Sequence, residues 1–235
     1  MQSYDIYELM IIPPNKKGEM LIDEIRKPEP NLNIVRDLIV LGANLDWFRT
    51  DGMTALHYGA LLNHPEILGL LIDAGADLNI QDNYGRTALQ VSAWYNHPDI
   101  TQVLIDAGAD VNIQEEYGST ALHRCADMNR PEIARMLIDA GADLNIQDNR
   151  GKTPLHRCVD WNNPEIARML LDAEADVNIQ DNDGSTALHV SAYWNHSRIA
   201  KMLIDAGADM NMRNNDGKLP YELARTQELQ ELLKL

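Results

Sequence analysis

Histidine and cysteine are the residues of this chain that could bind a metal ion or support catalysis. The seven histidines fall into two sets whose members recur at intervals of 33 residues or a multiple of 33: His57, His64, His97, His123, His156, His189 and His196. Equivalent side chains a whole structural repeat apart cannot share a metal ion, because zinc–nitrogen bonds are only about 2 Å long. We therefore expect neither a metal site nor a catalytic histidine.

Each cysteine stands two residues after a histidine, in His123-Arg124-Cys125 and His156-Arg157-Cys158. That spacing could pair a thiolate with an imidazole base. Small residues fill the same position elsewhere in the chain, namely Gly59, Ser92 and Ser191. We interpret both cysteines as small core residues, and buried structural cysteines are unreactive.

The cysteines are also expected to be free thiols. Cys125 and Cys158 lie 33 residues apart, in neighbouring repeats whose stacked helices would be about 8–10 Å apart, whereas a disulfide needs Cα atoms within about 7 Å. Free thiols suit a reducing compartment. The sequence also lacks a Walker loop, a dinucleotide fingerprint and a Gly-x-Ser-x-Gly elbow, so we expect no enzyme activity and no cofactor.

A dipeptide ending in glycine recurs every 33 residues along the chain: Asp51-Gly52, Tyr84-Gly85, Tyr117-Gly118, Arg150-Gly151, Asp183-Gly184 and Asp216-Gly217. A fixed period of this length indicates one supersecondary unit that is copied and stacked around a continuous core. Positions within each copy are numbered here from Arg49, Asp82, Glu115, Asp148, Asp181 and Asn214.

Position six predicts the start of a first short helix. It is occupied by Thr54, Thr87, Thr120, Thr153 and Thr186, and threonine is a good N-cap residue. Pro154 follows one of these threonines, at a first helical position that needs no backbone donor. This helix should end at position fifteen, because asparagine tolerates left-handed backbone and fills that position as Asn63, Asn96, Asn129, Asn162 and Asn195.

A second helix is predicted from position seventeen, where Pro65, Pro98, Pro131 and Pro164 stand. The segment Ile133–Ala140 carries apolar residues at i, i+3, i+4 and i+7, which make one apolar stripe. Glycine then ends this helix at Gly75, Gly108, Gly141 and Gly207. Glu174 takes the place of that glycine in one copy, so we expect strain of about 1 kcal/mol there.

These motifs resemble the ankyrin repeat. The resemblance rests on T-A-L-H or T-P-L-H at Thr54–His57, Thr120–His123, Thr153–His156 and Thr186–His189, and on G-A-D-L-N or G-A-D-V-N, and it covers about residues 20–235. It implies an all-α solenoid of stacked ankyrin repeats, slightly curved, in which each repeat has a helix-turn-helix and a β-hairpin loop. It also implies a binding module with no chemistry of its own.

The repeat divides the chain into four parts. We expect an N-terminal extension at residues 1–16, a divergent capping repeat at 17–48, five consecutive repeats at 49–213 and a C-terminal capping repeat at 214–235. In the first cap, Leu21–Lys27 and Ile34–Leu41 align with the two helices, and the last copy should carry a charged helix out to Leu235. The extension either covers the first repeat or docks a second partner through Tyr4, Ile6, Tyr7, Met10, Ile11 and Ile12.

One further motif depends on the resemblance. An asparagine follows a leucine by eight residues at Asn79, Asn112, Asn145, Asn178 and Asn211. In the family this resembles the substrates of an asparaginyl hydroxylase. The alternative interpretation is a turn asparagine that hydrogen-bonds the backbone of its own loop.

The composition suits a folded protein. Apolar residues make up 45% of the chain and charged residues 24%, which is ample for a core. No apolar run reaches the ~18 residues that span a bilayer, and no secretory signal is recognisable. We expect a cytoplasmic protein, with delivery into a host cell by a dedicated secretion system left open.

The resemblance implies that partners dock on a concave face made of the first helices and hairpin tips. The variable positions there hold eight of the thirteen aromatic residues, and Tyr58 is one of the eight. Exposed Trp and Tyr dominate interface hot spots, although the rings could instead stack on neighbouring repeats. The predicted partner-binding residues are Tyr84, Arg86, Trp94, Tyr95, Tyr117, Arg124, Asp127, Met128, Arg150, Lys152, Arg157, Asp160, Trp161, Tyr193 and Trp194.

Charge narrows the class of partner. The chain has a formal net charge of −16, yet the variable positions carry six cations and six anions. Nucleic-acid binding needs a basic stripe, and mimicry of nucleic acid needs acid on the binding face. We therefore expect a monomer that binds a protein of unknown identity and neither nucleic acid nor membrane. The alternative is a structural protein that self-associates through the same face.

Overall fold

A computed structural model describes residues 10–234. The chain divides into two compact units, residues 1–116 and 117–235, and each is described by itself. Within the described residues the secondary structure is helical, apart from one isolated antiparallel bridge between Phe48 and Thr54. The prediction of an all-α repeat fold is confirmed.

The first unit begins with a divergent helix pair. Its helices are α2 (Pro14–Ile25), α3 (Leu32–Val40), α4 (Ala55–Leu61), α5 (Pro65–Asp73), α6 (Ala88–Tyr95) and α7 (Pro98–Asp106). Helix α2 starts well before the predicted Leu21, because Pro13 has extended backbone and Pro14 fits the first helical position. Helix α4 packs on α6, and each also packs on the second helix of its own copy.

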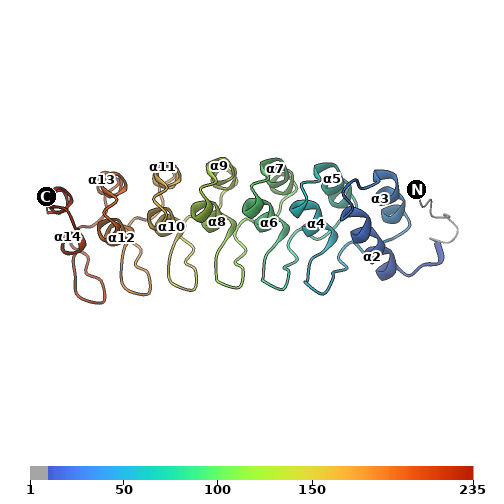
Figure 1. The fold of residues 1–235 in the computed structure, drawn as a ribbon, viewed down its shortest axis with the longest axis horizontal. Helices are drawn as coiled ribbons and strands as arrows, with labels where there is room; N and C mark the ends of the chain where they lie inside the picture. The colour runs from blue at the N-terminus through green and yellow to red at the C-terminus, as the bar shows by residue number, and fades with distance from the viewer. Residues whose placement is uncertain (1–9, 235) are drawn as a thin grey trace. The chain divides into compact units, whose positions relative to one another are not determined.

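The second unit repeats the same pair. Its helices are α8 (Ala121–Met128), α9 (Pro131–Asp139), α10 (Pro154–Asp160), α11 (Pro164–Asp172), α12 (Ala187–Trp194), α13 (Ser197–Asp205), α14 (Pro220–Leu223) and α15 (Gln227–Leu232). Within this unit the first helices α8, α10 and α12 form one layer and α9, α11 and α13 another, and the hairpins project beyond the first helices (Figure 1). The predicted charged C-terminal helix is two short helices, because the backbone at Ala224 is extended.

The threonine caps are confirmed. At α8 the backbone N–H of Thr120 donates to Nδ1 of His123 at 3.1 Å, and the Thr120 hydroxyl oxygen lies 2.9 Å from the same nitrogen. The histidine therefore completes a capping box, a reciprocal arrangement that satisfies the exposed donors of a helix N-terminus. The asparagines at position fifteen are left-handed as predicted, with φ of +58° at Asn63 and +61° at Asn96.

The second nitrogen of each capping histidine joins consecutive copies. His123 Nε2 lies 3.0 Å from the carbonyl oxygen of Lys152, in the next copy. Because Nδ1 accepts a hydrogen bond, Nε2 carries the proton and the ring is neutral. Burial lowers the pKa of His123 to about 4. Among residues 10–234, no group of three or more His, Cys, Asp or Glu is placed to hold a metal ion.

The second helices also begin as predicted, with proline at the first position of α5, α7, α9 and α11. Glycine with positive φ follows them at Gly75, Gly108, Gly141 and Gly207. Glu174 has φ of +64° at the equivalent place. The glutamate that replaces glycine in this copy therefore adopts the left-handed backbone conformation that the prediction of strain requires.

In residues 10–234 the hairpins form without strands, apart from the isolated bridge between Phe48 and Thr54. At one tip the Asp148 N–H donates to the Lys152 carbonyl at 2.9 Å, and the Gly151 N–H donates to the Asp148 carbonyl at 2.8 Å. Asp148 Oδ1 then accepts the N–H groups of Arg150 and Lys152. A side chain closes the turn, so two backbone bonds suffice and no ladder extends from it.

Two smaller predictions concern Cys and Asn side chains. Cys125 and Cys158 are buried and free, as predicted, and burial raises the pKa of both thiols. The Asn145 side chain accepts the Asp176 N–H at 2.9 Å, in the next copy. The interpretation that this side chain bonds the backbone of its own loop was wrong at Asn145, because its Oδ1 atom accepts from the loop of the next copy instead.

Little of the N-terminal extension lies within the described residues. Met10 and Ile11 are exposed, so these two side chains do not cover the first repeat. Tyr4, Ile6 and Tyr7 lie outside the described residues. Nowhere in residues 10–234 is there a helix with the length and apolar character to cross a bilayer.

Candidate functional site

Exposed apolar side chains recur at position fourteen in the second unit. Met128, Trp161 and Trp194 occupy it in three consecutive copies, with 38%, 62% and 50% of their surfaces exposed. All three stand at the C-terminal ends of first helices, α8, α10 and α12. Three large apolar side chains, two of them indole rings, are therefore exposed to solvent along the first-helix layer of this unit.

Neighbouring residues hold these rings in place. Trp161 Nε1 donates to Asp127 Oδ1 at 3.1 Å. The rings of Tyr193 and Trp194 meet edge to face at 82°, with centroids 5.0 Å apart, and the Arg225 guanidinium lies 4.8 Å from the Tyr193 centroid. A ring fixed before binding loses less conformational entropy when a partner covers it.

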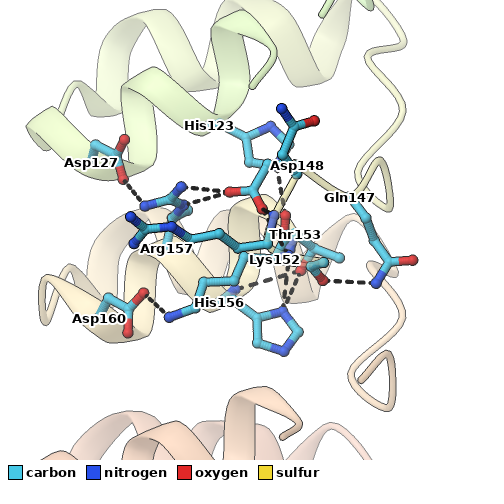
Figure 2. Close-up of polar contacts among 12 residues, drawn as sticks. His123, Asp127, Gln147, Asp148, Lys152, Thr153, His156, Arg157 and Asp160 are labelled. Carbon is cyan, nitrogen blue, oxygen red and sulfur yellow. Dashed lines mark hydrogen bonds and ion pairs between the residues drawn. The ribbon is translucent and has the colours of Figure 1, made fainter. Parts of the chain in front are cut away.

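A cluster of charged side chains includes Asp127, the partner of Trp161, and we call it the guanidinium–carboxylate cluster: Arg124, Asp127, Asp148 and Arg157. Figure 2 shows Asp127, Asp148 and Arg157 of this cluster. Arg157 Nε and Nη2 both donate to Asp148 Oδ2, at 3.0 and 2.5 Å. Arg157 Nη1 lies 3.8 Å from Asp127 Oδ1, and Arg124 Nη1 lies 3.4 Å from Asp127 Oδ2. Two arginines thus offset two carboxylates.

Burial and pairing act in opposite directions on these carboxyl groups. Burial raises the pKa of Asp127, against the opposing effect of Arg157 and Arg124. Burial also acts to raise the pKa of Asp148, but hydrogen bonds from the Lys152 backbone and from Arg157 outweigh it, so the pKa is lowered. By formal charge the two arginines balance the two aspartates of the cluster.

Of the other residues that the sequence predicts as partner contacts in the second unit, some are paired within the chain and others are exposed. Lys152 Nζ donates to Asp160 Oδ2 at 2.5 Å, as Figure 2 also shows. Arg150 and Tyr117 are exposed. The structure thus brings Asp127, Arg157 and Trp161 into one contact group, and it places Lys152 and Asp160 in a separate pair.

The first unit contains the remaining predicted residues. Arg86 Nε and Nη2 donate to Asp82 Oδ2 at 2.9 and 2.7 Å, and the same guanidinium lies 4.9 Å from the Tyr84 ring centroid. Tyr84 and Tyr95 are exposed and Trp94 is half-buried.

Tyr58 differs from the other rings at the variable positions. It is only 6% exposed, and its hydroxyl donates to Asp51 Oδ2 at 2.6 Å. The Arg26 guanidinium lies 5.2 Å from its ring centroid. The expectation that this ring lines the docking face was wrong, because its own neighbours cover it.

Sequence reasoning missed the carboxylates at position one. Asp82 and Asp148 are almost fully buried and each receives two bonds from one guanidinium. A pattern that could have revealed them is present in the sequence, since acid recurs at position one while arginine appears at position five or ten. The sequence predicts Arg86 and Arg157 only as contacts of a partner. In the structure both form ion pairs with aspartates of their own copy.

Comparison with known proteins identifies the family to which the chain is similar. A family model described as ankyrin repeats in three copies matches residues 25–115, 110–181 and 141–214. No curated protein matches the chain. A solved structure, the ankyrin repeat domain of Bcl-3, described as a unique member of the IkappaB protein family, is 27% identical, covers 96% of this chain and 99% of its own, and superposes with a TM-score of 0.85.

Proposed function

Because this chain belongs to the family of ankyrin-repeat proteins, we propose that it is a non-enzymatic module that binds a protein partner through the first-helix layer and hairpin tips of residues 117–235. Ankyrin repeats generally mediate protein–protein interaction. The role of the bound complex is that of an adaptor, an inhibitor or an effector scaffold.

One observation carries this proposal, the recurrence of exposed Met128, Trp161 and Trp194 at one position of three consecutive copies. Large apolar side chains cost free energy when they are exposed to water, and burying one in an interface recovers about 25 cal/mol for each Å² removed from water. Tryptophan, tyrosine and arginine are also the residues on which binding energy concentrates. We call these three residues the position-fourteen row.

The guanidinium–carboxylate cluster supports the proposal in a second way. It fixes Trp161 through Asp127, while its balanced charge leaves no long-range attraction for nucleic acid. A surface with rigid apolar anchors and paired charges fits a folded or peptide-like protein epitope. The residues predicted from the sequence in the first unit, Tyr84, Arg86, Trp94 and Tyr95, are not part of this docking surface.

The proposal is tested by affinity capture from the native source with quantitative mass spectrometry. Wild type is compared with Trp161→Ala/Trp194→Ala, and we expect at least one protein that only wild type retains. Circular dichroism checks that both proteins are equally helical. Equal capture by both proteins would place binding outside the position-fourteen row.

A matched control variant lies on the second helices. Arg168→Ala/Lys201→Ala removes two exposed side chains from α11 and α13, and it should capture the same proteins as wild type. Light scattering over a range of concentrations addresses self-association. A mass that rises with concentration in wild type, but not in Trp161→Ala/Trp194→Ala, would show that the row binds a second copy of this chain.

A further inference from the structure

The aspartates at position one of the repeat differ in whether a guanidinium binds their second carboxylate oxygen. The Asp82 Oδ2 atom receives two hydrogen bonds from the Arg86 guanidinium, and the Asp148 Oδ2 atom receives two from Arg157. Arg86 stands at position five of its copy and Arg157 at position ten. The guanidinium thus reaches the equivalent oxygen from two different places in the sequence.

Asp181 is the third aspartate at position one, and its copy has no arginine at position five or ten. Ser185 occupies position five and Val190 position ten. Asp181 Oδ1 accepts the backbone N–H groups of Asp183 and Ser185 at 3.0 and 2.8 Å, as the same atom does at Asp82 and Asp148. Among residues 10–234, Oδ2 of Asp181 receives no hydrogen bond and forms no ion pair.

The Asp181 side chain lines an open cleft. The residue is 8% exposed and borders a space of about 470 Å³ beside α10, α12 and α14. Asp183 and Asp216 add exposed carboxylates to its rim, and Tyr193 and Trp194 add aromatic rings. The cleft reaches the position-fourteen row at Trp194.

The lysines that line the cleft do not neutralise Asp181. Lys152 is paired with Asp160 at 2.5 Å. The exposed Lys218 forms no ion pair within the described part of the chain, and its backbone N–H donates to Asn214. The Asp181 residue is mostly buried while its Oδ2 atom is open to the cleft, so pairing with a cation would offset part of the free-energy cost of burying the charge. Asp181 therefore favours a cation that enters from solvent.

We propose that an arginine of the bound protein inserts into this cleft and places its guanidinium on Asp181 Oδ2, in the manner of Arg86 on Asp82 and Arg157 on Asp148. The inference rests on the proposed function and specifies the partner, a protein with an arginine in an exposed, extended segment. Arginine is favoured over lysine, because the rigid guanidinium directs two N–H groups at one carboxylate oxygen, as Arg86 and Arg157 do, and an ammonium group has no such fixed pair of donors. The Tyr193 and Trp194 rings offer apolar surface for the arginine's methylene groups.

The experiment uses small probes, so it needs no identified partner. N-acetyl-L-arginine amide and N-acetyl-L-lysine amide, which carry the same charge, are titrated into the full chain and followed by ¹H–¹⁵N NMR. The amides of Asp183 and Ser185 are the reporters, because both donate to Asp181 Oδ1. We expect saturable shifts at these amides with arginine, and about tenfold weaker binding of lysine.

Two variants remove the site in different ways. Asp181→Asn removes the charge but keeps the Oδ1 acceptor, and the chain shows that asparagine suits this position, since Asn214 Oδ1 accepts the Lys218 N–H in the next copy. Ser185→Arg supplies the missing guanidinium from position five, as Arg86 does. Both variants should lose the arginine-dependent shifts, and Ser185→Arg should also raise the thermal midpoint. Asp183→Asn, an exposed acid on the same rim, should keep them.

The outcomes separate this inference from the proposed function. Equal response to both probes, or shifts that persist in Asp181→Asn and Ser185→Arg, would overturn the arginine site while leaving capture through the position-fourteen row intact. Shifts confined to arginine and lost in both variants would support the site. If capture then proved independent of Trp161 and Trp194, the proposed function would fail while the arginine site stood.

Discussion

Replacing Glu174 with glycine should stabilise the protein. Glu174 follows α11 with φ of +64°, in a position where the equivalent copies have Gly75, Gly108, Gly141 and Gly207 with φ between +80° and +89°. An L-residue in left-handed backbone brings its Cβ close to the following carbonyl, and glycine has no such contact. The substitution removes this strain without changing the turn.

The size of the effect follows from the surroundings. A Cβ atom built at Gly141 or Gly207 meets nothing within 4 Å, so a side chain here costs backbone strain and no clash. That strain is about 1 kcal/mol, and removing a negative charge from a helix C-terminus adds about 0.3 kcal/mol. Glycine gains flexibility in the unfolded chain, which offsets part of this. We expect a net gain of about 1 kcal/mol, or about 2–4 °C in Tm for a chain of this size.

Urea denaturation followed by circular dichroism measures the change, and two variants identify its cause. Glu174→Gln keeps the side chain and removes the charge, so it should recover only the electrostatic part. Gly141→Glu introduces the same strain in the preceding copy and should lower stability by about 1 kcal/mol. If Glu174→Gly were no more stable than Glu174→Gln, backbone strain would not be the cause.

Three further predictions concern the capping histidines and the guanidinium–carboxylate cluster. His123→Gln should be nearly neutral and His123→Ala should cost about 1–3 kcal/mol in urea denaturation, because Gln90 makes the equivalent bond to Thr87 and donates from its side-chain amide to the Ile113 carbonyl. A large loss in His123→Gln would refute this role. The pKa of His123 is lowered to about 4 from 6.5, so its contribution to stability is full above pH 6.5 and is lost as pH falls toward 4. By pH 4.5 this loss is about 2–3 kcal/mol, and His123→Gln should show a correspondingly smaller loss of stability between pH 7 and 4.5. Arg157→Ala leaves buried Asp148 without its cation and should cost about 3 kcal/mol in thermal or urea denaturation, whereas an unchanged midpoint would show that water replaces the guanidinium.

The cluster illustrates how one residue can serve stability and recognition together. Arg157 stabilises Asp148 in its own copy, and Asp127 beside it holds the Trp161 ring. A partner that docks on Trp161 meets a ring whose orientation is already set. Substitutions at Arg157 should therefore change stability and, through the position of Trp161, partner binding. A binding measurement on an Arg157 variant should be accompanied by a measurement of its stability.

Much of the fold follows from local sequence. The 33-residue period, threonine at position six, asparagine at position fifteen and proline at position seventeen each act through the conformation of a few neighbouring residues. The helix boundaries they predict therefore agree closely with α8 to α13. The prediction failed where no repeated motif marks the boundary, at the start of α2 and at the break between α14 and α15.

The candidate site was less accessible to sequence reasoning. The variable positions pointed to Trp161 and Trp194, and both are exposed. Tyr58 occupies a variable position as well, yet Asp51 and Arg26 cover it. Exposure depends on what neighbouring copies place against a ring, and composition does not record that.

The sequence by itself determined the repeat, its two helices, their caps and the free cysteines, because each of these depends on residues close together in the chain or on exact periodicity. Only the tertiary structure decided which charges are already paired. Arg157 meets Asp148 and Asp127 from different segments. Asp181 has no such partner in the part of the chain that the structure describes, because ion pairing depends on the direction and reach of side chains brought together by packing.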